Sequence, residues 1–440
     1  MSKEIEIVSL LTMVQEWISS RYAPALTAAD KKVQIKTYIE KFLRDRDYCV
    51  AGFSTGDLIE RLYEEMAEYS ILTRFLGRDD IEEINVNSWD DVAITYTNGV
   101  IEKQKEHFFS PQHSIDIVKR LLHHSGMIID DAMPVSQGHL PNNTRITALK
   151  TPVVDEESGI SVSIRLLHPN KVNLQQVVTS GEGTQKMIDF LCLCIRYGIS
   201  TVVAGATSSG KTTLMNALLS TIPNNKRVFT IESGARELTL VRRDEESGRI
   251  VNNVVHTLSR PSDNAARDIP QEALVVYALR FNPDTLVIGE MRDVECYAAV
   301  EASLTGHTVV STVHADAGAG THMRIALLCQ KRFPIDFNTS LVQAGQAFPI
   351  VVYTHRLENN DRKIMDISEC EITPSGERKY HTLFRYHITR NEIINDEFVC
   401  EGHFEQVEFI SDSLKDKLLR FGVPLSELQK FITEKGADYS

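Results

Sequence analysis

The spacing of apolar residues divides the chain into blocks with different periodicities. In residues 1–75, apolar side chains recur at intervals of three and four, as in Leu58, Leu62 and Met66, which predicts amphipathic helices. Ser54 or Thr55 is a candidate N-cap for the helix that carries these three residues. We therefore expect a small helical cap at residues 1–75.

The next block, residues 76–168, mixes strand and helix patterns. Apolar and polar residues alternate in IEEINVN and DVAITYTNGVIEKQ, where Asn98-Gly99 predicts a tight hairpin turn. A helix pattern follows in SPQHSIDIVKRLLHHSG, beginning after Ser110 and ending at Gly126. Two more strand patterns lie in GHLPNNTRITALK and GISVSIRLLH. The block predicts an α+β N-terminal domain.

The pattern changes again after a short stretch at residues 169–178, which we interpret as a hinge linker. Strands alternate with helices over residues 179–355, as is typical of a parallel sheet with crossover helices. Residues 356–440 add short strands and a closing helix from Ser411, a C-terminal extension. The predicted fold class is therefore α/β, with an α+β domain and a helical cap before the parallel-sheet domain.

Composition and charge narrow the class of protein. The 440 residues are 42% hydrophobic and carry a net charge of −13, which argues against a general nucleic-acid-binding protein. No run reaches the roughly 18 apolar residues that span a bilayer, and the start, MSKEIEIV, lacks a signal-peptide pattern. The seven cysteines include no CxxC pair, so their spacing disfavours zinc and favours reduced thiols. We expect a cytoplasmic protein.

One glycine-rich stretch, GATSSGKT, fits a phosphate-binding loop (P-loop) at every fixed position, between a strand pattern and a helix pattern. Glycines let backbone N–H groups turn toward phosphate oxygens, and the helix N-terminus adds its positive dipole end. Lys211 is expected to reach the β- and γ-phosphates, and the Thr212 hydroxyl to hold Mg²⁺. The expected nucleotide-binding residues of the loop are Gly205, Ala206, Thr207, Ser208, Ser209, Gly210, Lys211, Thr212 and Thr213.

Hydrolysis requires an acid and a group near the γ-phosphate, and three further strand patterns supply candidates. Glu290 ends the apolar strand of RFNPDTLVIGEMRD and is expected to face Mg²⁺, partly through water, and the attacking water. Glu232 ends RVFTIE and could polarise water or hold Mg²⁺ through water. His307 and His314 bracket HTVVSTVHAD, and an imidazole there can hydrogen-bond to the γ-phosphate. These four residues are the predicted catalytic set.

Taken in order, GATSSGKTT, TIESGAREL, NPDTLVIGEMRD and TGHTVVSTVHA resemble the motifs of the type II/type IV secretion ATPase superfamily, closest to its CpaF-like branch, which drives Tad pili and related conjugative secretion machines. Upstream, IEEINVNSWDDVAI and AMPVSQGHLPNNTRITAL resemble the N-domain of this family. Downstream, DISECEI and LFRYHI resemble its closing strands, so the resemblance covers about residues 70–390.

The resemblance implies a RecA-like ATPase domain that binds ATP and Mg²⁺ and works as a homo-hexameric ring. It implies that Glu232 is the acid of the Asp box, Glu290 the Walker-B glutamate, and His307 with His314 the His box. It further implies an inner-membrane platform protein as partner, no direct contact with nucleic acid, and a location at the cytoplasmic face of the membrane.

Two N-domain arginines, Arg145 and Arg165, match family arginines that reach the nucleotide phosphates. An arginine delivered to the γ-phosphate would stabilise transition-state charge and couple domain closure to turnover. The alternative reading of both residues is arginines on solvated strand ends.

The sequence also departs from the family pattern. Ser233 follows Glu232 where an aspartate is usual, and the His box reads Gly-His-Thr-Val-Val. A nucleotide-gated structural ring with little hydrolysis is therefore an alternative to the motor. A DNA-translocating P-loop motor is a third reading, against which the acidic balance and the lack of an aromatic–basic stripe count. The zinc-binding cysteines of some type II relatives are absent, which favours the CpaF-like branch.

Overall fold

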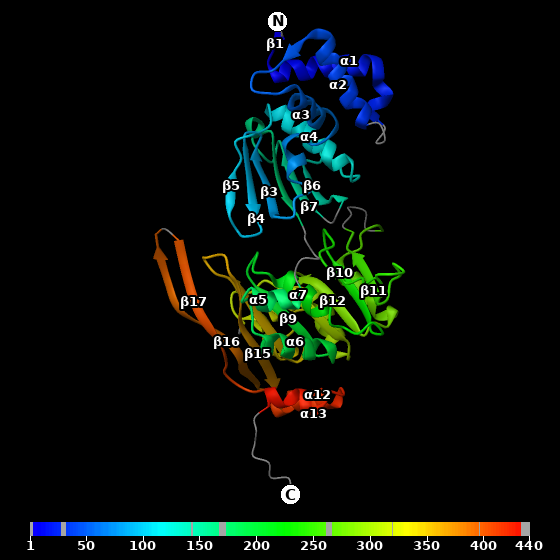
Figure 1. Cartoon of the computed structure of the whole chain (residues 1–440). Helices are drawn as coiled ribbons and strands as arrows, with labels where there is room; N and C mark the ends of the chain where they lie inside the picture. The colour runs from blue at the N-terminus through cyan, green and yellow to red at the C-terminus, as the bar shows by residue number, and fades with distance from the viewer. Residues whose placement is uncertain are drawn as a thin grey trace. The chain divides into compact units, whose positions relative to one another are not determined.

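The computed structural model describes residues 3–27, 32–141, 144–166, 173–260, 266–318, 320–395 and 397–432. The chain folds as two compact units, Met1–Leu167 and His168–Ser440 (Figure 1). Nowhere in the described ranges does a helix combine the length and hydrophobicity that crossing a bilayer requires.

The first unit begins with the predicted helices. They are α1 (Ile7–Thr27), α2 (Lys32–Arg46) and α3 (Thr55–Ala67), with a short parallel pair of strands, β1 (Lys3–Glu4) and β2 (Tyr48–Cys49). Of the two candidate N-caps, Ser54 is the residue used, because its hydroxyl accepts the N–H of Asp57 at 3.2 Å. Leu58 and Leu62 of α3 are buried against α1 and α2, as their spacing predicts.

An antiparallel six-stranded sheet follows in the order β5-β4-β3-β8-β7-β6. Its strands are β3 (Ile81–Ser88), β4 (Asp91–Tyr96), β5 (Ile101–Lys103), β6 (Val135–His139), β7 (Arg145–Lys150) and β8 (Ile160–Arg165). Helix α4 (Pro111–His123) starts after the Ser110 cap and buries Ile117 and Leu121 in the core on one face. Short 3-10 turns lie at Ser70–Arg74 and Glu156–Ser158.

The second unit is built on a nine-stranded sheet in the order β11-β10-β12-β13-β9-β14-β15-β16-β17. The parallel strands are β9 (Thr201–Gly205), β10 (Arg227–Glu232), β11 (Asn253–Leu258), β12 (Thr285–Met291), β13 (Thr308–Val313) and β14 (Ile350–Arg356). The antiparallel strands are β15 (Arg362–Ile372), β16 (Arg378–Ile394) and β17 (Glu397–Gln406). The expectation of a parallel sheet therefore holds for six strands, and the sheet continues without a break through the expected extension.

Helices cover both faces of this sheet, so the second unit has three layers (Figure 1). Side chains of β9 alternate between the two cores, with Val203 on the face of α6 and α7 and Val202 on the face of α8 to α11. The helices are α5 (Leu174–Thr179), α6 (Gln185–Arg196), α7 (Lys211–Leu219), α8 (Gln271–Ala278), α9 (Glu295–Leu304), α10 (Thr321–Gln330), α11 (Phe337–Ala347), α12 (Asp412–Arg420) and α13 (Leu425–Leu428). Two 3-10 turns, Leu279–Phe281 and Gln429–Phe431, follow α8 and α13.

The expected hinge at residues 169–178 lies partly outside the described residues, because the description resumes at Asn173. From there the chain is helical: Asn173 and Gln176 form a reciprocal capping box at the start of α5. This part of the expected linker is therefore ordered structure of the second unit.

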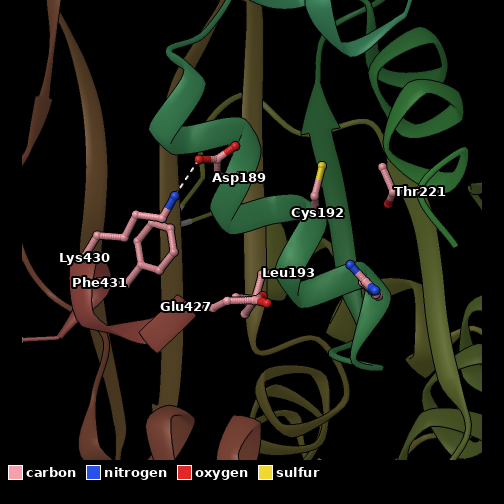
Figure 2. A pocket seen from close by; sticks show the side chains of 8 residues that line it. Asp189, Cys192, Leu193, Thr221, Glu427, Lys430 and Phe431 are labelled. Carbon is pink, nitrogen blue, oxygen red and sulfur yellow. Dashed lines mark hydrogen bonds and ion pairs between the residues drawn. The ribbon is translucent and has the colours of Figure 1, made fainter. Parts of the chain in front are cut away.

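The C-terminal helices pack on α6 and close one face of the second unit. Ser411 caps α12 as predicted, accepting the Leu414 N–H at 3.0 Å. Phe431 is fully buried, and its ring centroid lies 5.3 Å from that of Phe190. Figure 2 shows Lys430 reaching toward Asp189 of α6, beside a pocket that Cys192 also lines. The Lys430 ammonium lies 2.6 Å from the Asp189 carboxylate, and the pocket has a volume of about 330 Å³. Residues 411–432 thus belong to the core of this unit.

Candidate functional site

The glycine-rich stretch forms a tight loop between β9 and α7, and the packing explains its first glycine. A side chain at Gly205 would place Cβ 2.3 Å from the backbone oxygen of Thr354 on β14, closer than real Cβ contacts come. Two other residues of the loop, Ser208 (φ 60°) and Gly210 (φ 90°), have left-handed backbone. Gly210 is the N-cap of α7. The predicted loop therefore lies at a helix N-terminus, where backbone N–H groups favour a phosphate.

Lys211, the first residue of α7, folds back over the loop. Its ammonium donates to the backbone oxygen of Ala206 at 2.7 Å and lies 3.4 Å from Nδ1 of His314. The side chain is buried, whereas Thr212 is half-buried and Thr213 is exposed in the first turn of the same helix. The loop and the first turn thus present one buried cation and two hydroxyls at the same edge of the sheet.

His314 lies between Lys211 and Glu290 at one edge of the sheet. Glu290 and His314 come from the ends of the neighbouring parallel strands β12 and β13, and β13 in turn pairs with β9. Nε2 of His314 lies 3.2 Å from Oε1 of Glu290. Burial, then the nearby Lys211 ammonium, lowers the pKa of His314, so its imidazole is neutral at pH 7. Because an ammonium can only donate, a hydrogen bond from Lys211 to Nδ1 requires the neutral tautomer with its proton on Nε2, next to the carboxylate.

Glu232 ends β10, but its carboxylate is turned into its own loop. Oε1 accepts the backbone N–H groups of Glu237 at 2.7 Å and Leu238 at 2.9 Å. Oε2 is buried, and no hydrogen bond to it is found within the described part of the chain. Burial raises the pKa of Glu232 to about 7. In this conformation Glu232 organises the loop after β10, and its predicted work on water or Mg²⁺ stays a prediction.

Ser233, the residue where the family usually has an acid, also has a partner. Its hydroxyl accepts from a terminal nitrogen of the Arg292 guanidinium at 3.2 Å. Because Ser233 is neutral, it binds this arginine more weakly than a carboxylate at the same position would.

His307 does not join the loop, contrary to the prediction for the pair of histidines. It precedes β13, while His314 follows it, and the seven residue steps between them span about 23 Å. Because β13 runs parallel to β9, His307 lies at the amino edge of the sheet and the loop lies at the carboxyl edge. Within the second unit, His307 is not part of the site.

The two predicted arginines are direct cross-strand partners in the first unit. Arg145 on β7 pairs with Arg165 on β8, so both side chains project from the same face of the sheet. A terminal nitrogen of Arg165 lies 3.7 Å from Glu82. Two like charges opposite each other repel, and an anion between them would relieve that cost. Their predicted contact with nucleotide stays a prediction.

The sequence reasoning missed three side chains that contact the loop. Oγ1 of Thr354 lies 3.0 Å from Oγ of Ser209, and Nε of Arg362 donates to the backbone oxygen of Ser208 at 3.2 Å. Glu182 lies beside Gly210. No local signal could have found them, because Arg362 is 154 residues from its partner in sequence.

The sheet order, the loop and the Lys211–His314–Glu290 cluster define a P-loop protein with acids at the carboxyl edge of its sheet. The chain belongs to the type II/IV secretion system protein family, whose sequence model matches residues 65–393. The family resemblance of the four motifs is thereby confirmed.

Individual relatives match over shorter stretches. An uncharacterized protein of Methanocaldococcus jannaschii is 31% identical over 209 residues, covering 46% of this chain and 34% of that protein. The type IV secretion system protein PtlH of Bordetella pertussis is 32% identical over 186 residues, covering 41% of this chain and 52% of that protein. The matches thus span about a third to a half of the length of these relatives. The X-ray structure of the Legionella pneumophila ATPase DotB is 19% identical, with a TM-score of 0.45, covering 79% of this chain and 82% of that one.

Proposed function

We propose that this chain is an ATP hydrolase that supplies the energy for a secretion or pilus machine. The observation that carries the proposal is the cluster of Lys211, His314 and Glu290 at the mouth of the phosphate-binding loop. A buried ammonium, a neutral imidazole and a carboxylate at one strand edge suit the hydrolysis of a phosphoanhydride. Membership of the type II/IV secretion system protein family is the reason to assign this activity to a secretion or pilus machine.

The roles of the residues follow from their positions. The backbone N–H groups of residues 206–212 bind phosphate oxygens, and Lys211 exchanges the Ala206 carbonyl for the β- and γ-phosphates. Glu290 orients the attacking water and accepts its proton at the carboxylate. His314, held between Glu290 and Lys211, places its Nε2–H where a γ-phosphate oxygen or the carboxylate can accept it.

Mg²⁺ fits the donor set at this edge. The Thr212 hydroxyl in the first turn of α7 and the Glu290 carboxylate are the oxygen ligands that this cation prefers. When bound, the ion would neutralise charge on the β- and γ-phosphates.

The larger assembly is part of the same proposal. We place this chain in a homo-hexameric ring of the CpaF-like branch, on the cytoplasmic face of the membrane, acting on an inner-membrane platform protein. Arg145 and Arg165 would bind nucleotide phosphates in that ring. Their side-by-side position on an open sheet face supports this, because paired like charges favour an anion.

Phosphate release by the purified chain with ATP and Mg²⁺ tests the activity. Lys211→Ala and Glu290→Gln should each lower the rate at least 100-fold. Lys331→Ala is the matched control, because Lys331 is exposed on the same unit and pairs with Asp293. A rate unchanged in Lys211→Ala, or no heat of ATP binding to the wild-type chain, would refute the proposal.

A nucleotide-gated ring with little hydrolysis is the second candidate. The observation that favours it is the carboxylate of Glu232, which is bound to its own loop, together with the neutral Ser233 next to it. A wild-type rate equal to that of Glu290→Gln, with ATP binding intact, would select this function over the motor.

A further inference from the structure

The phosphate-binding loop contains one residue with a side chain in an unfavourable backbone conformation. Ser208 has φ 60°, a left-handed value that costs energy for a residue with a side chain, and Gly210 has φ 90°. Such a conformation persists where the surrounding structure holds it. The contacts that hold this loop therefore help to set its conformation.

Those contacts come from the β14–β15 hairpin. Thr354 on β14 bonds to the Ser209 hydroxyl and, at 3.2 Å, to the backbone oxygen of Ala204. Arg362, the first residue of β15, donates its Nε–H to the backbone oxygen of Ser208, the residue with left-handed backbone. The same side chain lies against the loop, because a Cβ added at Gly210 would be 3.1 Å from its Cδ.

Glu182 completes this arrangement. Its Oε1 would be 3.4 Å from a Cβ at Gly210, so the carboxyl lies on the same side of the loop as Arg362. Its backbone oxygen accepts the Ile364 N–H at 2.8 Å, and Lys363 donates to the backbone oxygen of Gly181 at 2.9 Å, which ties this segment to β15. Burial raises the pKa of Glu182 to about 7, and the charges of Arg362 and Lys363 oppose that rise.

A buried acid beside a loop that binds a polyphosphate is unfavourable unless a cation offsets it. Arg362 is the cation placed to do so, and its Nε is already engaged with the loop. We propose that Arg362, with Glu182 beside it, is a positioning residue that holds the loop in its phosphate-binding conformation before nucleotide arrives. This inference deepens the proposed function and rests on it for the identity of the nucleotide.

The test compares the wild-type chain with Arg362→Ala, Arg362→Lys and Arg356→Ala. Arg356 is the matched control, since it ends β14 at the other side of the same turn and bonds to Asn360 within the turn. Hydrogen exchange of the amides of residues 206–211 is measured in the nucleotide-free protein, and the Kd for ATP is measured by calorimetry. The KM and kcat for phosphate release are measured alongside.

In Arg362→Ala we expect loop amides to exchange at least 10-fold faster, with exchange in β10 and β12 unchanged. We expect Kd and KM to rise about 10-fold and kcat to change less than 2-fold. Arg362→Lys should be intermediate, because it restores the charge but not the Nε donor, and Arg356→Ala should match the wild type.

Loop exchange and Kd equal to the wild type in Arg362→Ala would overturn the proposal, and so would a fall in kcat with Kd unchanged. Failure of the proposed function looks different: if the wild-type chain binds ATP without releasing phosphate, or binds none, the exchange of the nucleotide-free loop still decides the role of Arg362.

Discussion

Replacing Glu232 separates its structural role from a catalytic one. Its Oε1 accepts two backbone N–H groups of the loop after β10, of which that of Leu238 is buried and that of Glu237 is partly buried. Glu232→Ala leaves the Leu238 donor buried without a partner, whereas the partly exposed Glu237 donor can bind water, so we expect a loss of about 1–3 kcal/mol in the free energy of unfolding. Glu232→Gln keeps an acceptor oxygen in the same place and should lose much less.

The assay follows the second unit by itself. Both tryptophans, Trp17 and Trp89, lie in Met1–Leu167, so their fluorescence in urea reports the first unit and serves as an internal control. Hydrogen exchange in β10 reports the second unit, and far-UV circular dichroism reports both units together. Glu232→Ala should lower the unfolding midpoint of the second unit while the tryptophan transition stays in place. A midpoint equal to that of the wild type would refute the structural role.

Activity measured on the same variants addresses the chemistry. If Glu232→Gln is stable but releases no phosphate, the carboxylate acts on water or metal as well as on its loop. If Glu232→Gln hydrolyses ATP like the wild type, the residue serves only the loop, and its predicted catalytic role is wrong.

The pH dependence of stability gives a further check on the same residue. Burial raises the pKa of Glu232 from 4.5 to about 7, so the folded protein favours the protonated side chain. The stabilisation that this preference gives to the folded state is fully present below pH 4.5 and is lost as the pH rises through about 7. At about 1.4 kcal/mol per pH unit, the loss is at most about 3 kcal/mol. The glutamine of Glu232→Gln cannot titrate. Between pH 4.5 and 7 the free energy of unfolding of this variant should therefore rise by up to that amount relative to the wild type. A difference independent of pH would contradict the burial argument.

Three other expectations follow from the geometry. The pKa of His314 should lie below 6.5 by NMR titration and should rise in Lys211→Ala, because the Lys211 ammonium helps to lower it. An unchanged pKa in Lys211→Ala would show that the ammonium does not lie close to this imidazole. Gly205→Ala should lower the melting temperature of the second unit by several degrees and weaken ATP binding, since its Cβ would collide with a backbone oxygen of β14; unchanged values would show that β14 can move away. Phe431→Ala should lower the free energy of unfolding by about 3–5 kcal/mol, because the ring is fully buried. Lys430→Ala removes only a surface ion pair and should lower it by under about 1 kcal/mol. Equal losses for the two variants in urea unfolding would contradict this ranking.

The phosphate-binding loop could be predicted from the sequence because its signals are local. Glycines at 205 and 210, a lysine at 211 and the flanking apolar patterns lie within about twenty residues, and the structure places them as a strand, a loop and a helix. Glu290 and His314 were predictable for a related reason. Each ends a buried strand, and the carboxyl ends of parallel strands share one edge of a sheet.

The remaining features depend on strand pairing and side-chain direction, which local sequence does not encode. His307 was misplaced because the six-residue length of β13 puts it at the other edge. Strand β11 was missed because its residues are only partly buried at the edge of the sheet, so its apolar pattern is weak. The direction of the Glu232 carboxylate, toward its own loop, depends on tertiary contacts alone. The same is true of the hydrogen bond from Arg362 to the phosphate-binding loop.

The continuity of the nine-stranded sheet has a mechanical consequence. Strand β14 hydrogen-bonds to β9, which leads into the phosphate-binding loop, and also to β15, which pairs with the 17-residue β16. At about 3.3 Å per residue, β16 is a lever of about 55 Å. Backbone hydrogen bonds join these strands on both sides of the irregularities at Tyr353/Thr354 and Ile367/Ser368, so a force applied to β15 and β16 can reach the base of the loop through the main chain.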